Sequence, residues 1–202
     1  MLFGLVAPAL PSLSNSGKTN TAISGIAGTL EQARQYAVAQ NTYVWVAFRQ
    51  NASDANGGSL EVVVLASKSG IDPSPWADFG SVPNANIDLI GKIQTYPMAK
   101  LGEAGAFTAA QIPTLPNISP EVSSINNSPA STAVFKVNVR GQAVDFGRAL
   151  QFTPSGEARN TSSPVNVIEF ALQAMRGATL ESHNIAVFRV NGFTGNTMVY
   201  RP

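Results

Sequence analysis

The sequence has no cysteine and only one histidine, and each shortage excludes a class of chemistry. Without cysteine the chain can form neither a disulfide framework nor a cysteine-based metal site. One histidine cannot build a multi-histidine metal site, and no G-x-S-x-G turn offers it a serine nucleophile. We expect His183 to be an exposed residue in a polar turn. We therefore predict no catalytic residue, no metal, no cofactor and no enzymatic activity.

Charge is also scarce, because only 12% of the residues are charged, about half the usual share for a soluble domain. The 13 basic and 12 acidic residues are interleaved and give a net charge of +1. No basic stripe is visible, and the C-terminal tail carries only Arg189 and Arg201. We expect neither a nucleic-acid partner nor a small-molecule substrate. A surface that takes its polarity from Ser, Thr, Asn and Gln suits a protein of the periplasm or cell surface, or one packed among neighbouring copies.

Residues 1–18 contain an apolar run that is far short of the roughly 20 residues needed to cross a bilayer as a helix. The run also lacks the basic start and the length of a secretory signal. Pro8 and Pro11 predict a kink or a helix start. We interpret this segment as the tail end of a longer apolar helix whose front is absent. The alternative is a short buried helix or arm. The residues assigned to assembly here are Leu2, Phe3, Leu5 and Val6.

The strongest periodic signal predicts an amphipathic helix over residues 19–41. Ile23, Ile26 and Leu30 recur at spacings of three and four and continue into an alanine stripe that allows close approach to a sheet. We assign these three residues to the same assembly helix. Asn41 is the expected C-terminal cap, because asparagine tolerates a left-handed backbone. The Ser16–Thr19 segment resembles part of a phosphate-binding loop but lacks its first glycine, so we interpret it as a capping segment.

Residues 42–202 predict a β-rich head domain. Apolar and polar residues alternate over several short runs, with turn residues between most of them. The predicted strands are residues 44–48, 60–65, 87–95, 135–140, 149–152, 165–174, 185–190 and 198–200. We therefore predict an α+β fold that is pilin-like, with a long N-terminal helix packed on an antiparallel sheet that can fold over into two sheets.

Residues 69–131 form a proline-rich, loop-rich excursion within this head. Trp76, Phe79 and Tyr96 are candidate ligand-contact aromatics, because exposed aromatics on long loops often bind. The alternative is that they form a small core that holds the loops in place. Outside this excursion, Asp54 lies in a turn that faintly resembles a calcium loop, but no glutamate closes it, so turn chemistry is the simpler explanation.

Three sequence features together resemble a known family. The helix carries an A-R…A…N pattern at Ala33, Arg34, Ala37 and Asn41, directly before a strand. An F-x-P-x-G motif follows at Phe152, Pro154 and Gly156, and the chain closes with G-x-T-G…Y-R-P at Gly192 to Pro202. This arrangement resembles the pseudopilins of the GspH/FimT type, and its ending resembles a verrucomicrobial group of them.

The resemblance implies a minor subunit of a type IV pilus or a type II secretion filament. Its partners would be other pilin or pseudopilin subunits, and the missing N-terminal segment of a precursor would anchor it in the inner membrane before assembly. The family's leader, processing site and early glutamate are absent from this sequence. Two alternatives remain open: a surface module that binds a glycan or host receptor through residues 69–131, and a subunit that binds DNA during uptake.

Overall fold

The computed structural model describes residues 10–51, 58–71, 86–102, 105–108, 110–117, 122–125, 135–139, 142–160 and 164–202. Within them one helix precedes twelve strands. The elements are α1 (Leu10–Gln40), β1 (Val44–Asn51), β2 (Ser59–Ser67), β3 (Ile87–Pro97), β4 (Ala99–Gly102), β5 (Val122–Ser124), β6 (Phe135–Val139), β7 (Gln142–Phe146), β8 (Arg148–Phe152), β9 (Ala158–Arg159), β10 (Val167–Arg176), β11 (Thr179–Asn191) and β12 (Thr197–Tyr200).

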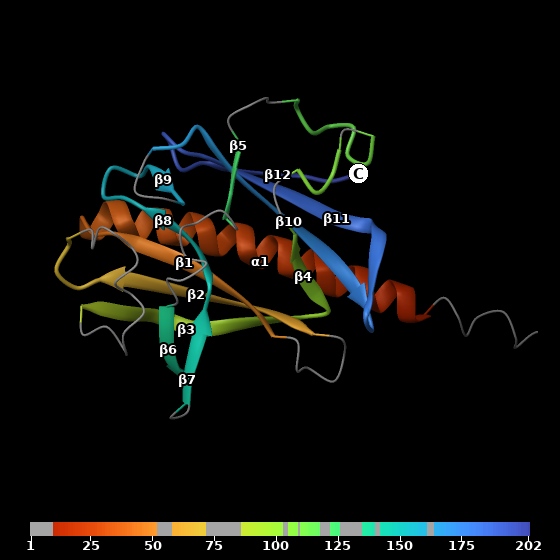
Figure 1. Cartoon of the computed structure of the whole chain (residues 1–202), viewed down its shortest axis with the longest axis horizontal. Coiled ribbons are helices and arrows are strands. Elements are labelled where there is room, and N and C mark those ends of the chain that lie inside the picture. Colours follow the sequence, from red (N-terminus) through yellow and green to blue (C-terminus); the bar gives the residue numbers. More distant parts are fainter. Residues whose placement is uncertain are drawn as a thin grey trace, which may run out of the picture.

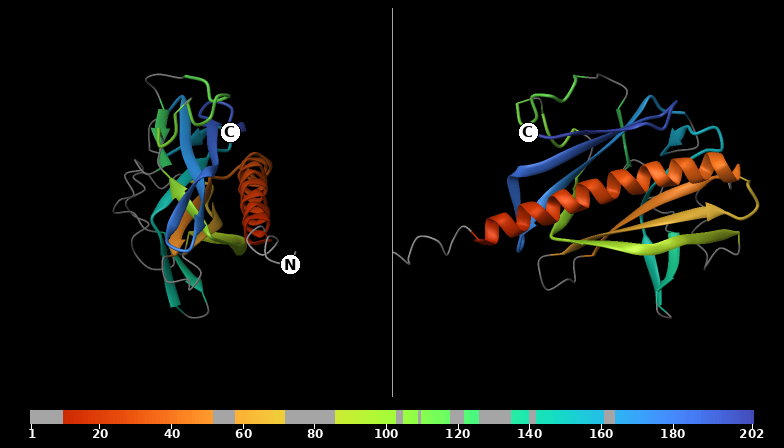
Figure 2. Two further views of the ribbon diagram at one scale, coloured as in Figure 1. Left: turned by 90° about the vertical axis from the view of Figure 1, so that its right-hand side faces the viewer. Right: turned by 180° about the vertical axis from the view of Figure 1, so that it is seen from behind.

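The strands form three sheets (Figure 1). The first sheet has the order β3-β2-β1-β8-β9, and all its pairs are antiparallel. The second has the order β12-β11-β10-β4, and β5 pairs in parallel with β10. The third is the hairpin β6–β7. The edge strands β3 and β12 therefore lie on opposite sides of the molecule (Figures 1 and 2).

The predicted fold class is wrong. In the described part of the chain the structure is mostly β, with 53% strand against 18% helix, and its strands form several sheets. The prediction was a pilin-like α+β fold with a long helix packed on an antiparallel sheet that can fold over into two. The error has a physical source. The helix gives the most regular hydrophobic period in the sequence, whereas β4, β5 and β9 are two to four residues long and too short to show a period of two.

The single helix begins earlier than predicted and ends as predicted. Pro11 is its second residue, where a proline costs no helical hydrogen bond, and the polar stretch that follows is helical as well. Asn41 has φ of +49°, which confirms the left-handed cap. In the described part of the chain, no helix has both the length and the apolar character needed to cross a membrane.

The main core lies between α1 and the two large sheets. The apolar stripe of α1 faces the backs of both sheets, along which the helix runs (Figure 2). Within the core, the ring of Phe170 in β10 stacks on that of Phe188 in β11 with 4.8 Å between the ring centroids, and its centroid lies 5.3 Å from that of Phe48 in β1. Each fully buried side chain of this size contributes roughly 1.5–3 kcal/mol to folding. The helical residues in this core include Ala22, Ile23, Ile26, Leu30, Ala33 and Ala37.

Two smaller apolar clusters cover the other faces of the sheets. The hairpin β6–β7 places Val137 and Phe146 over Trp45 of the first sheet. Phe107, Ile112 and Leu115, from the proline-rich excursion, pack on the second sheet. The described parts of the excursion are therefore packed onto the molecule, and they also supply β3, β4 and β5.

The strand predictions agree with most of the structure. The β1–β2 and β11–β12 hairpins are confirmed, as are the strands within β3, β6, β8 and β10. The sequence missed β4, β5, β7 and β9. Gln142 begins β7, opposite Val139 of β6.

Candidate interaction surface

The three motifs that carry the family resemblance meet at Arg34. A Cβ atom built on Gly195 would lie 2.7 Å from Arg34 Cδ and closer still to the carbonyl of Gly156. One built on Gly156 would lie 3.8 Å from Arg34 Nη1 and 3.4 Å from Val38 Cγ2. Both glycines have positive φ, of +86° at Gly156 and +67° at Gly195. Only glycine fits at both positions, because the backbone is left-handed and the Arg34 stem fills the space beside it.

Arg34 is held in place by an ion pair on its own helix. Its Nη2 and Nε atoms donate to the two carboxylate oxygens of Glu31 at 2.7 and 3.1 Å, and Gln35 donates to the same carboxylate at 2.9 Å. The hydrogen bond from Arg34 lowers the pKa of Glu31, and the same bond raises the pKa of Arg34. Partly exposed pairs of this kind contribute little free energy. Their effect here is to fix the arginine against the two glycines.

The turn between β11 and β12 is tightly braced. Asn191 Oδ1 accepts hydrogen bonds from the backbone N–H of Phe193 and Thr194, both at 3.0 Å, while Gly195 N donates to Asn191 O at 2.8 Å. Gly192 exchanges backbone bonds with neighbouring segments, and a Cβ there would overlap the Val165 carbonyl. The turn holds Phe193 with 61% of its surface exposed.

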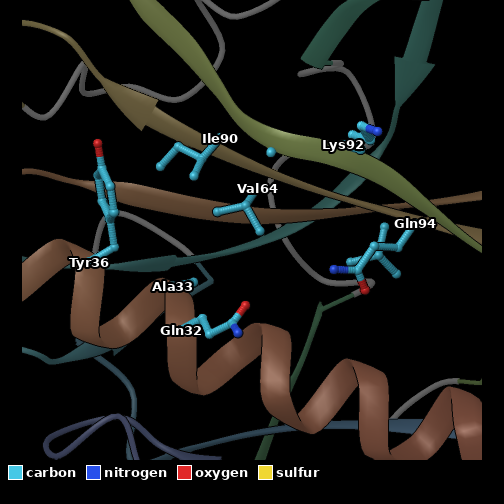
Figure 3. A pocket seen from close by; sticks show the side chains of 9 residues that line it. Gln32, Ala33, Tyr36, Val64, Ile90, Lys92 and Gln94 are labelled. Atoms are coloured by element: carbon cyan, nitrogen blue, oxygen red, sulfur yellow. The ribbon is translucent and has the colours of Figure 1, made fainter.

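A groove of about 280 Å³ lies between α1 and strands β2 and β3 (Figure 3). Val64 and Ile90 of the sheet face Tyr36 and Ala33 of the helix across it, as Figure 3 shows. The groove lining is mainly apolar, with a polar rim of Gln32, Lys92 and Gln94.

Beyond Tyr36 the surface continues into a second hollow of about 370 Å³ with a polar lining. Lys68 and Asp88 form an ion pair there at 3.0 Å. The ring of Tyr36, which is 39% exposed, separates this hollow from the apolar groove. Apolar and polar contact surfaces therefore lie on either side of one aromatic side chain.

The structure describes four of the ten predicted site residues. Ile23, Ile26 and Leu30 are buried in the chain's own core, so their apolar surface packs within the subunit. Tyr96 is half-buried between β3 and α1, its hydroxyl donates to Gln94, and burial raises its pKa. The others lie outside the described residues: Leu2, Phe3, Leu5, Val6, Trp76 and Phe79.

The weaker chemical candidates are placed as follows. Gly17, Lys18 and Thr19 lie within the continuous helix α1, so they form no phosphate-binding loop. His183 is exposed, as expected, but it belongs to β11 rather than to a turn. Asp54 lies outside the described residues. In the described ranges, no three acidic or histidine side chains gather in a way that would hold a metal ion.

A buried ion pair that sequence reasoning missed joins the second sheet to its cover. Arg189 Nε donates to Glu169 Oε2 at 2.6 Å, and the two side chains are 8% and 4% exposed. Glu169 Oε1 accepts from Gly105 N at 2.8 Å, and Arg189 Nη1 donates to Pro116 O at 2.6 Å. The pair therefore ties Gly105 and Pro116, from the described segments 105–108 and 110–117, to β10 and β11. No sequence signal marked it, because the two residues are twenty positions apart and flanked by ordinary strand patterns.

Comparison with known proteins yields no match: no family model, curated protein or solved structure is similar to the chain.

Proposed function

We propose that this protein is a structural subunit of a filament, of the type IV pilus or type II secretion class, that assembles through its N-terminal helix. Its partners are other pilin or pseudopilin subunits. It functions in the periplasm or at the cell surface, after anchoring in the inner membrane through a precursor segment, and it performs no reaction. The observation that carries this proposal is the placement of α1, which the sheets cover on one face.

The uncovered face of α1 carries a run of small, uncharged residues in the N-terminal half of the helix, whereas Lys18, Gln32 and Tyr36 are larger residues exposed elsewhere on it. Gly17, Thr21, Ser24 and Gly28 follow one another at spacings of four, three and four, and all four are exposed. Nothing lies within 4 Å of a Cβ atom built on Gly17 or Gly28. Small residues along one helix face let a second helix approach closely. The first turns of α1 also extend past the ends of the strands (Figures 1 and 2), where a neighbouring subunit can reach them.

The motif geometry supports the same proposal. Arg34, Gly156 and Gly195 come from three parts of the sequence and form one contact at the C-terminal end of α1. This contact fixes the helix relative to the β-rich head. A filament subunit that assembles through its N-terminal helix needs such a fixed connection between the helix and the head.

The two alternative functions gain less from the structure. Tyr96 is half-buried and bonded to Gln94, which removes one of the three aromatics proposed to contact a ligand. Arg189 is paired with Glu169 inside the molecule, so Arg201 is the remaining arginine of the two expected in a DNA-binding tail. We therefore place ligand binding and DNA binding behind the filament role.

Site-directed photo-cross-linking tests the proposal, because the natural chain has no cysteine to compete. A Ser24→Cys variant, produced in the source cells with its natural upstream sequence and labelled with a benzophenone maleimide, presents the probe on the exposed face of α1. We expect defined adducts whose partner, identified by mass spectrometry, is a pilin-like subunit. The matched control is Thr179→Cys, exposed at the tip of the β10–β11 hairpin. Equal adducts from both positions, or none from Ser24→Cys, would contradict assembly through the helix.

A further inference from the structure

The turn that carries Phe193 and the groove beside Tyr36 lie on opposite flanks of α1. Successive helical residues are rotated by about 100°, so Tyr36 and Val38 are about 200° apart around the helix. Tyr36 lines the groove toward β3, whereas Val38 and Arg34 contact the glycines on the β12 side. Phe193 therefore cannot reach the groove of its own chain.

The two surfaces are complementary in chemistry. Phe193 is an exposed aromatic that its braced turn holds out from the molecule. The groove is an apolar hollow whose floor, Val64 and Ile90, is only partly covered within the subunit. An aromatic anchor in an apolar hollow with a polar rim is the arrangement found at the centre of protein interfaces. Because both halves are on one chain, the partner that fits each half is another copy.

We propose that Phe193 of one subunit inserts into the groove between α1 and β3 of a second copy. The contact joins two different surfaces, so it is heterologous, and it leaves a free turn at one end of the pair and a free groove at the other. It can therefore repeat along a row of subunits. Its biological role rests on the proposed filament function, whereas the contact itself can be tested without it.

The contact is weak between free molecules. One aromatic side chain buries about 150–250 Å², against roughly 800 Å² per partner in a stable interface. Isolated subunits are therefore expected to remain largely monomeric through this contact alone. Where another contact holds subunits side by side, the effective concentration rises to the millimolar range and the same contact becomes occupied.

The rigidity of the turn distinguishes Phe193 from an ordinary exposed apolar residue. Asn191 Oδ1 accepts hydrogen bonds from the N–H groups of Phe193 and Thr194 and so fixes the backbone before and after the Phe193 Cα atom. The close approach of Gly195 to Arg34 fixes the turn to α1. An anchor that is already held in its binding position loses little conformational entropy on insertion. Leu180 is the comparison residue, because it is also an exposed apolar side chain but lies at the other end of β11, where it pairs with Met175.

Disulfide trapping between single-cysteine variants of the full 202-residue chain tests the contact. Asn196→Cys marks the turn and Lys92→Cys marks the groove rim. When the two proteins are mixed at high concentration under mild oxidation, we expect the mixed dimer to form faster than either homodimer. Adding Phe193→Ser to the turn variant should slow mixed-dimer formation about tenfold, the ratio that corresponds to about 1.4 kcal/mol. Adding Leu180→Ser instead should leave the rate within about twofold of the parent, because surface substitutions away from a contact have small effects.

Two results would overturn the proposal. One is random pairing, in which homodimers form as fast as the mixed dimer. The other is a mixed dimer whose rate does not change with Phe193→Ser. Unchanged thermal unfolding of the Phe193→Ser protein shows that any effect is not a loss of folding, and Ile90→Ser in the groove variant repeats the test from the other side. The Ser24→Cys experiment probes a different surface, so loss of the turn–groove contact and loss of the filament role give separate results.

Discussion

The buried pair Glu169–Arg189 offers the sharpest test of how the second sheet is held. Both charges are almost fully removed from solvent and face each other at 2.6 Å. Substituting Glu169→Gln leaves the guanidinium buried without its counter-ion, with the Pro116 carbonyl and the ring of Tyr200, 5.6 Å away, as its remaining partners. Removing one member of a buried ion pair typically costs about 3–5 kcal/mol.

The expected result is a large loss of thermal stability. For a domain of this size, each kcal/mol shifts the unfolding temperature by about 2–4 °C. Glu169→Gln and Arg189→Met should therefore each lower the midpoint by roughly 6–20 °C, measured by circular dichroism with urea unfolding as the second assay. The double variant Glu169→Leu/Arg189→Met should recover much of the loss, because the uncompensated charge is gone.

The exposed pair Lys68–Asp88 is the matched control, with side chains 47% and 64% exposed. Lys68→Met should change the unfolding free energy by less than about 1 kcal/mol. The reasoning is refuted if Glu169→Gln costs no more than Lys68→Met. It is also refuted if the double variant Glu169→Gln/Arg189→Met is as unstable as the sum of its two single variants, because the charges would then act independently.

Two further predictions concern the C-terminal half of α1. Gly195→Ala should destabilise the protein by about 2–4 kcal/mol in urea unfolding, because the new Cβ meets Arg34 and Gly156 and adds overpacking to left-handed strain. The control is Gly177→Ala, where φ is +59° and the space is open, so only the strain of about 1–2 kcal/mol should be lost. Equal losses of stability in the two variants would refute the contact between Gly195 and Arg34. Arg34 lowers the pKa of Glu31 below 4.5, so the pair stabilises the folded state above the unfolded pKa, and this contribution is lost as the pH falls through the folded pKa. Glu31→Gln should therefore remove a small acid-dependent part of the stability, and an unchanged stability difference between pH 7 and pH 3 would contradict the pairing.

Sequence reasoning recovered those elements whose period repeats over enough residues. The helical stripe of Ile23, Ile26 and Leu30 fixed one face of α1, and the structure buries that face against the sheets. The β1–β2 hairpin was recovered for the same reason. The start of α1 was misplaced because Ser and Asn favour caps, yet here they continue the helix from Pro11. Packing can override such a local preference.

The sheet architecture depended on contacts that the sequence pattern does not show. Gln50 links the two large sheets, because its side-chain amide donates to Ala99 O at 3.0 Å and accepts from Leu101 N at 3.1 Å. These partners lie about fifty positions away and belong to β4, a strand too short to predict. Without β4 the connection between the sheets cannot be inferred, and the share of strand in the fold is underestimated. The fold-class error follows directly from these missing short strands.

The candidate interaction surface was likewise only partly predictable from the sequence. Arg34, Gly156 and Gly195 were each visible as motif residues, because each type is unusual in its setting, but their meeting depends on how β8, β12 and α1 pack. The groove was not predicted, because Val64 and Ile90 look like ordinary strand residues in the sequence, and only the fold shows that they line a groove beside α1. A partly buried apolar residue indicates a contact with another subunit only when the fold shows that its exposed part lines a groove. Ile90 is only partly buried in the groove, and Phe193 is the braced, exposed aromatic that the same chain presents on the opposite flank of α1.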